Sequence, residues 1–138
     1  MNRIIKFRGQ NKNDWHYGSY IFRDGKHFIL IEDDDNGYYS EVEVKGETIG
    51  QYTGLKDKNG KEIYEEDILK SGVSDVICKI NIGHYDDTSS SQHDIMGVWF
   101  NIVGEKKPYG FAKAVLTKDS CNIMEVIGNI YDNPELVN

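Results

Sequence analysis

Residues that favour β-strands far outnumber the apolar residues that favour helices, and this imbalance limits the fold more than any motif does. The 138-residue chain has 41 Ile, Val, Tyr, Phe and Trp residues, against 5 Leu and 2 Ala. β-Branched and aromatic side chains suit a pleated, half-buried surface, whereas Leu and Ala are strong helix formers. The composition therefore predicts a mainly β fold with few or no long helices.

Turn residues divide the chain into short segments. Asp24-Gly25 and Asn59-Gly60 are two-residue hairpin signals, and at Asn59-Gly60 we predict a type I′ turn with both residues at positive φ. Strands are expected over residues 3–8, 15–22, 26–31 and 38–44, and then over 75–82, 97–103, 111–116 and 123–130. Glycines at 46, 50 and 54 change the composition of the chain, and we place the boundary between two subdomains near them. We predict an N-terminal β-meander over residues 1–48, packed with a small C-terminal β-barrel or roll over residues 49–138.

The charge of the chain disfavours general binding to nucleic acid. The formal net charge is −7, and only 3 of the 16 cationic side chains are Arg, whereas binding to a phosphate backbone depends on cationic side chains. A basic N-terminal edge provides the exception, because no acidic residue precedes Asp14. Its candidate phosphate-binding residues are Arg3, Lys6, Arg8 and Lys12. The alternative is an edge strand whose charges discourage aggregation.

Aromatic residues gather at the second expected strand. Trp15, His16, Tyr17, Tyr20 and Phe22 could form a stacking platform for a single-stranded nucleic acid. Alternation along a strand explains them more simply as core residues. We therefore expect them to be buried.

A polar stretch contains the best candidate metal ligands, namely His84, Asp86, Asp87 and His93. Imidazole and carboxylate suit zinc or a non-haem metal, but no established ligand spacing occurs. We favour a polar contact loop and predict no metal or cofactor, with a metal-dependent enzyme as an alternative. Cys78 lies in an apolar run and has no evident orienting group, so we interpret it as a core residue and not as a nucleophile working with His84.

No motif in the sequence indicates nucleotide-dependent or esterase chemistry, since phosphate-loop, dinucleotide-binding and nucleophile-elbow patterns are missing. No apolar run approaches the ~18 residues of a membrane span, and Met1 to Arg8 contain no secretory h-region. We therefore expect a soluble, intracellular, non-enzymatic protein with no membrane partner.

Two long blocks carry a family resemblance, Gln51–Tyr64 and Val126–Leu136. With the opening Ile5–Arg8 and Trp15–Gly18 segments, they resemble the YopX family of phage and prophage proteins. Glu66 departs from the family pattern, which commonly has Gly before the Asp-Ile pair found here as Asp67-Ile68. If that position needs positive φ, Glu66 is expected to be strained.

The resemblance implies a β-rich fold containing an SH3-like roll, and a location in the cytoplasm of an infected or lysogenic bacterial host. It implies no catalytic residue, because the family has no established activity. We expect a phage or prophage accessory protein that binds a macromolecule, most simply a host or phage protein; homo-oligomerisation stays open.

Overall fold

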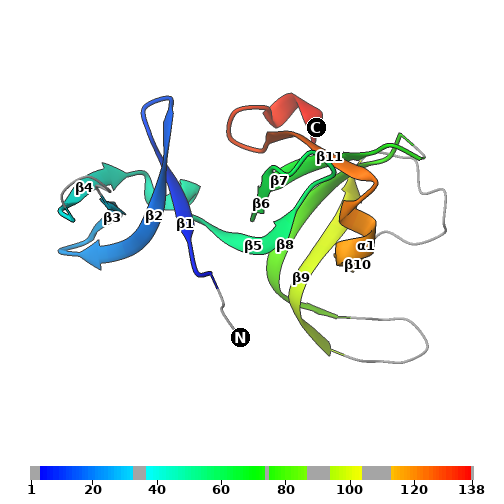
Figure 1. Ribbon diagram of the computed structural model, residues 1–138, viewed down its shortest axis with the longest axis horizontal. Helices are drawn as coiled ribbons and strands as arrows, with labels where there is room; N and C mark the ends of the chain where they lie inside the picture. Colours follow the sequence, from blue (N-terminus) through cyan, green and yellow to red (C-terminus); the bar gives the residue numbers. More distant parts are fainter. Residues whose placement is uncertain (1–3, 33–36, 74, 87–93, 104–112, 138) are drawn as a thin grey trace. The chain divides into compact units, whose positions relative to one another are not determined.

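The chain forms two compact units, Met1–Gly54 and Leu55–Asn138 (Figure 1). The computed structural model describes residues 4–32, 37–73, 75–86, 94–103 and 113–137, and these are mainly β, which confirms the predicted fold class. The sequence placed the division after residue 48, whereas the structure places it within a continuous strand, β5 (Gly50–Lys56). The single α-helix of the described part, α1 (Lys118–Cys121), has four residues, and no helix there is long and apolar enough to cross a membrane.

The first unit contains one antiparallel sheet in the strand order β4-β3-β2-β1-β5. Its strands are β1 (Phe7–Asn11), β2 (Asp14–Arg23), β3 (Lys26–Glu32), β4 (Tyr39–Val44) and the beginning of β5. This order confirms the predicted four-stranded meander. The first strand was expected over residues 3–8 but begins at Phe7. It continues to Asn11, because Asn11 pairs with Asp14 across a tight turn.

The turn between β2 and β3 is the two-residue hairpin turn that its sequence predicts. Asp24 has φ 53° and Gly25 has φ 75°, and Arg23 pairs with Lys26 on either side of them. Two central residues at positive φ define a type I′ turn, whose twist matches that of the flanking strands. The Asp24-Gly25 hairpin is therefore confirmed.

One face of this sheet forms the interior of the first unit. Ile29 is fully buried on it, and Val44 is nearly so. The short 3₁₀-helix η1 (Gly46–Thr48) follows β4 and is fastened to β1 by two bonds that Gln10 makes. The Gln10 amide donates to Thr48 Oγ1 at 2.9 Å, and the Gln10 carbonyl accepts from the Lys45 amide at 2.9 Å. These bonds satisfy buried backbone groups and hold η1 against the sheet.

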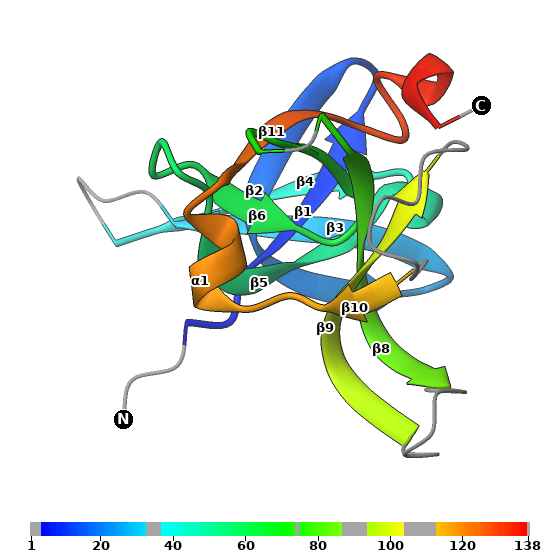
Figure 2. The ribbon, with the colours of Figure 1, turned by 90° about the vertical axis from the view of Figure 1, so that its right-hand side faces the viewer.

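The second unit contains an open five-stranded antiparallel sheet in the order β10-β9-β8-β7-β11, and its described strands do not close into a barrel. Figure 2 shows β8 and β9 curving together as a long hairpin. The elements are β6 (Glu62–Tyr64), β7 (Asp67–Ser71), β8 (Ile77–Asp86), β9 (Asp94–Val103), β10 (Lys113–Val115), α1, β11 (Met124–Asn129) and the 3₁₀-helix η2 (Pro134–Leu136). β6 is the neighbour of β5.

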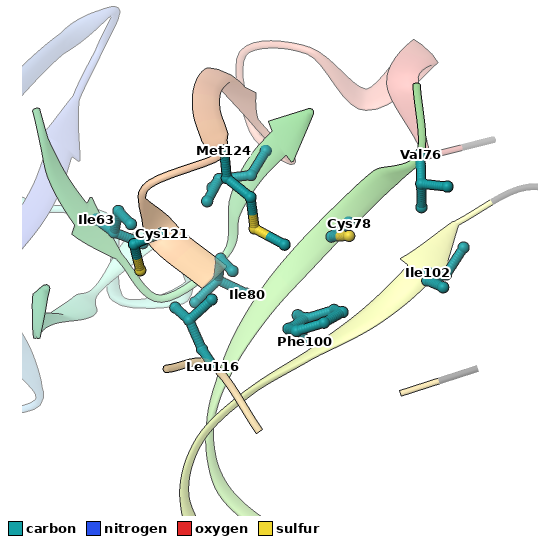
Figure 3. Close-up of a cluster of buried hydrophobic side chains, with 10 residues drawn as sticks. Ile63, Val76, Cys78, Ile80, Phe100, Ile102, Leu116, Cys121 and Met124 are labelled. Carbon is teal, nitrogen blue, oxygen red and sulfur yellow. The ribbon is translucent and has the colours of Figure 1, made fainter. Parts of the chain in front are cut away.

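Both cysteines belong to the hydrophobic core of the second unit (Figure 3). Burial raises the pKa of the Cys78 thiol to about 11. Burial, together with the negative charge of Asp57, also raises the pKa of Cys121. Cys78 is 1% exposed within this core, which confirms that it is a core residue. The core consists of Ile63, Leu69, Val76, Cys78, Ile80, Phe100, Ile102, Leu116, Cys121 and Met124.

The Asn59-Gly60 turn is a hairpin turn, as predicted, but its predicted type is wrong. Gly60 has φ 81°, whereas Asn59 is not among the described residues with positive φ. The reason is Asp57, whose Oδ1 accepts hydrogen bonds from the Asn59 and Lys61 amides at 2.8 and 2.9 Å. A side chain that bonds the backbone two and four residues ahead favours a longer loop, with Gly60 in the left-handed region.

The second family block ends in a turn built around Asn129. Asn129 Oδ1 accepts hydrogen bonds from the amides of Tyr131 and Asp132 at 3.0 and 2.9 Å. Gly128 lies against the Asn133 side chain, and a Cβ at this position would overlap the Asn133 amide group. The Val126–Leu136 block therefore encodes the turn that follows β11.

Glu66 occupies the backbone conformation that the sequence comparison anticipated, with φ 72°. Its amide donates to the Ile80 carbonyl at 2.8 Å, and its carboxylate pairs with Lys79 Nζ at 3.1 Å. Glu66 therefore adopts a conformation that favours Gly, while its side chain makes an ion pair that Gly cannot make.

Candidate functional site

The most distinctive surface of the described residues is the sheet face of the first unit opposite its interior. Alternation along β2 places Trp15, Tyr17 and Arg23 on this face. Cross-strand pairing adds Arg8, opposite Tyr17, and also Phe28 and Tyr39. We name this surface the Trp15 face and define it by Arg8, Trp15, Tyr17, Arg23, Phe28, Tyr39 and Glu41.

Two arginines of the Trp15 face lie over aromatic rings. The Arg8 guanidinium carbon is 4.6 Å from the centre of the Trp15 ring, and that of Arg23 is 4.7 Å from the centre of the Phe28 ring. At these distances the cation is attracted by the negative face of the ring. Two cation–aromatic pairs thus hold the long Arg side chains flat against the sheet.

Arg23 also makes a two-pronged ion pair with Glu41. Its Nη1 and Nη2 atoms donate to the two carboxylate oxygens at 3.1 and 2.8 Å. The hydrogen bond from Arg23 and its positive charge lower the pKa of Glu41, and the same contact raises the pKa of Arg23. The matched planes of guanidinium and carboxylate fix the orientation of Arg23 above Phe28.

Tyrosines supply the exposed part of this face. Tyr17 is 46% exposed and Tyr39 is 58% exposed, whereas Trp15 and Phe28 are half-buried. An exposed Tyr offers a large apolar ring and one hydroxyl, which suits contact with another macromolecule. The Trp15 face therefore combines held cations with accessible rings.

The predicted stacking platform is divided between the two sides of the sheet. Trp15 and Tyr17 lie on the Trp15 face, whereas His16, Tyr20 and Phe22 alternate to the other side. The Tyr20 and His27 rings stack there with centres 5.8 Å apart, and Tyr20 Oη hydrogen-bonds His27 Nδ1 at 2.6 Å. The expectation that all five residues are buried is wrong, because Tyr17 and Phe22 are 46% and 62% exposed and the other three are only half-buried.

The four basic candidates do not form one charged surface in the part of the chain that the structure describes. Arg3 lies outside the described residues. Lys6 is half-buried with its ammonium 5.4 Å from the centre of the Tyr52 ring, Arg8 is 5% exposed beneath its contact with Trp15, and Lys12 is exposed in the β1–β2 turn. The phosphate-binding role of these residues stays a prediction.

The metal candidates are only partly described. His84 is exposed on β8, and Asp86 ends that strand, while Asp87 and His93 lie outside the described residues. Within the described ranges, no group of three or more His, Cys, Asp or Glu residues could hold a metal ion. The metal-dependent alternative therefore stays a prediction.

Sequence reasoning missed Arg23, Phe28, Tyr39 and Glu41 as parts of one surface. Alternation assigns each residue to a side of its own strand, but only the register between strands shows which residues share a face. The Asp24-Gly25 turn contained a usable signal. A two-residue turn places Arg23 opposite Lys26, and this fixes the whole β2–β3 register.

Comparison with known proteins agrees with the fold. The crystal structure of protein EF1440 from Enterococcus faecalis is similar with a TM-score of 0.55 and 23% sequence identity, covering 99% of this chain and 100% of that one. No curated protein matches the chain. The model of the YopX protein family matches residues 6–138. The chain therefore belongs to the YopX family.

Proposed function

We propose that the protein is a non-enzymatic, protein-binding accessory module of a bacteriophage or prophage, and that it binds its partner through the Trp15 face. It acts in the cytoplasm of the infected or lysogenic bacterial host. The C-terminal unit corresponds to the SH3-like roll expected for the family. Membership of the YopX family supports the phage origin through the resemblance described above.

The observation that carries the proposal is the chemistry of one sheet face. Arg23 lies over the Phe28 ring, Tyr17 and Tyr39 are exposed on the same face, and Arg8 is buried against the Trp15 ring. Arg, Trp and Tyr are the residues most enriched at the energetic centres of protein interfaces. Their side chains are also held in place before binding, by the stacked rings and by Glu41, so little conformational entropy is lost when a partner docks.

The alternative of nucleic-acid binding has less support from the geometry. Arg8 is 5% exposed, so its guanidinium would have to leave Trp15 to contact a phosphate. Glu41, which belongs to the Trp15 face, and Glu43, on the same side of β4, also contribute negative charge there. A protein partner with apolar anchors and charges of both signs fits this surface better than a polyanion does.

The test compares two faces of one strand. Affinity capture from lysate of the bacterial host, with quantitative mass spectrometry, uses the wild-type chain, the Tyr17→Ala/Tyr39→Ala variant and Phe22→Ala as a control on the opposite face. We expect a partner that the wild type and Phe22→Ala retain equally and that the double variant loses. Equal capture by all three proteins, or no partner above background in any growth phase, would overturn the proposal.

Two further measurements identify other outcomes. Light scattering shows whether the partner is a second copy of this chain, in which case the double variant loses self-association. Titration of labelled single- and double-stranded DNA at low and moderate salt tests the basic edge. Binding with steep salt dependence that Lys6→Glu/Lys12→Glu abolishes would replace the protein-binding proposal with the nucleic-acid one.

A further inference from the structure

The Asn59-Gly60 dipeptide combines a reactive sequence with a turn that restrains it. Both residues are exposed in the turn between β5 and β6. Gly60 has no side chain, and a Cβ at this position would meet no atom within 4 Å other than those of Gly60 and its two chain neighbours. Because glycine has no Cβ beside its amide nitrogen, a following Gly hinders least the reaction in which an Asn side chain cyclises onto the next peptide nitrogen.

The folded turn holds the groups that would have to react. The Gly60 amide donates to the Asp57 carbonyl at 3.0 Å. On either side of it, the Asn59 and Lys61 amides donate to Asp57 Oδ1 at 2.8 and 2.9 Å. These bonds fix the peptide plane between Asn59 and Gly60, so the Gly60 nitrogen cannot rotate towards Asn59 Cγ until the turn opens.

A longer-range contact fixes Asp57 itself. Asp57 Oδ2 accepts a hydrogen bond from the Val126 amide of β11 at 2.9 Å, and the Asp57 side chain is buried. The Asn59 side chain is held more weakly, since its Nδ2 lies 3.4 Å from Glu125 Oε1 on the surface. The restraint on the turn therefore depends on Asp57 and on its attachment to β11.

We propose that Asn59 is a site of spontaneous hydrolytic deamidation, which the Asp57 turn suppresses in the folded protein and which becomes reactive when the turn opens. The inference is independent of the proposed partner binding, because it concerns the second unit and a covalent change. It assigns to Asp57 a protective role in addition to its structural one.

The reaction needs only water. The Gly60 nitrogen loses its proton to solvent hydroxide and bonds to Asn59 Cγ, while the bond from Cγ to Nδ2 breaks and ammonia leaves with a proton taken from water. Water then opens the resulting succinimide at one of its two carbonyl carbons. The products are aspartate or isoaspartate, each with one more negative charge than asparagine.

Either product is expected to weaken the turn. A carboxylate at Asn59 would replace an amide that donates to Glu125 Oε1, so two like charges would meet. An isoaspartate also lengthens the main chain by one methylene between β5 and β6 and disturbs their register. A chain that has opened and reacted therefore does not return to the original turn.

The experiment measures conversion of Asn59 by peptide mapping of the full chain, incubated in mildly alkaline buffer with and without urea. The second Asn-Gly dipeptide, Asn36-Gly37, is an internal reference in the denatured sample. In urea we expect Asn59 and Asn36 to react at similar rates, and in the folded protein we expect Asn59 to react at least about tenfold more slowly than in urea. Equal rates at Asn59 with and without urea, or no reaction at Asn59 in urea, would overturn the proposal.

Two variants separate the backbone restraint from the side-chain contact. Asp57→Asn is expected to accelerate conversion of Asn59 in the folded protein and to leave its rate in urea unchanged. Glu125→Gln is the matched control and is expected to react like the wild type. Equal acceleration by both variants would contradict the assigned role of Asp57. If Asp57→Asn fails to fold, amide hydrogen exchange of Gly60 in the wild type decides instead, because rapid exchange there would show that no restraint exists.

Discussion

In two turns of the second unit the side chain of Asp57 or Asn129 accepts hydrogen bonds from backbone amides, and we call these the anchored turns. The anchored turns and the Trp15 face of the first unit use polar groups in opposite ways. In the turns, carboxylates and amides are directed inward to backbone amides, as Asp57 is to Asn59, Lys61 and Val126. On the Trp15 face, Arg23 lies over the Phe28 ring and its side chain is still 49% exposed. The first arrangement determines the path of the chain, whereas the second leaves a surface that a partner can contact.

The two long sequence blocks that carry the family resemblance and the surface proposed to bind a partner therefore lie in different residues. The blocks that identify the family in the second unit contain Asp57 and Asn129, and the side chain of each accepts hydrogen bonds from backbone amides of a turn. The residues of the Trp15 face come from ordinary alternating strands. In this protein the strong motifs indicate where the chain turns, whereas the Trp15 face, which is proposed to bind a partner, carries no such motif. The predictions below test this separation, beginning with the largest effect.

Asp57→Ala is expected to lower the free energy of unfolding by about 3 kcal/mol. The change removes the charged acceptor of three partly buried hydrogen bonds from backbone amides, of which that of Val126 is distant in sequence. Urea unfolding followed by circular dichroism measures the loss. Asp119→Ala, at an exposed position of α1, is the control. A loss for Asp57→Ala no larger than that of the control would mean that the turn is not anchored.

The dependence of stability on pH should identify the same carboxylate. Burial acts to raise the pKa of Asp57, but the hydrogen bonds from Val126, Lys61 and Asn59 outweigh it and lower this pKa below its ordinary value. The unfolded chain therefore binds a proton before the folded one, so this stability is complete above about pH 5 and is lost as the pH falls through about 4 and below. We expect the wild type to lose more free energy of unfolding over this range than Asp57→Asn does. Parallel pH profiles for the two proteins would contradict the lowered pKa.

Variants of Glu66 test how much the departure from the family pattern at this position changes the stability of the protein. A side chain at φ 72° costs about 1 kcal/mol relative to Gly, whereas the half-buried pair with Lys79 offsets part of that cost. Glu66→Gly removes both effects and should change stability little, whereas Glu66→Ala keeps the backbone cost and loses the pair. Thermal unfolding should therefore show Glu66→Gly to be more stable than Glu66→Ala by about 1 kcal/mol. The reverse order would mean that the backbone at this position is not strained.

The parts of the fold that could be predicted from the sequence were those fixed by local geometry. Composition and alternation predicted the meander, and Asp24-Gly25 predicted a two-residue hairpin turn, in which the structure gives both residues positive φ. The type of the Asn59-Gly60 turn was wrong because Asp57, two residues before Asn59, competes for the backbone amides. β7 (Asp67–Ser71) was missed, because its residues make a strand only through pairing with β8 and β11, which lie further along the chain.

The candidate site was harder to predict because it depends on three strands at once. The basic edge and the aromatic platform were each proposed from one stretch of sequence, yet Arg8 contacts Trp15 across a strand pair and Arg23 reaches Glu41 on β4. Arg8 was only one candidate for phosphate binding, and its guanidinium lies over the indole ring of Trp15. Residue type therefore indicated that the N-terminal region carries charged and aromatic side chains, and only cross-strand register showed which of them meet.

The smallest expected effect is that of truncating tyrosines of the Trp15 face on the free energy of unfolding. It is the sharpest test of the difference between this face and the anchored turns. Tyr17 and Tyr39 are about half exposed or more, so truncating both should change the free energy of unfolding by less than about 1 kcal/mol. Phe22→Ala, on the opposite face, should change it by a similarly small amount. Urea unfolding of the three proteins beside the capture experiment separates the two roles. If the double variant keeps its stability and loses its partner, the Trp15 face serves binding. If the double variant loses several times more free energy of unfolding than Phe22→Ala does, these tyrosines stabilise the fold, as the anchored turns do. The proposed division between residues that determine the fold and residues that bind a partner would then not hold.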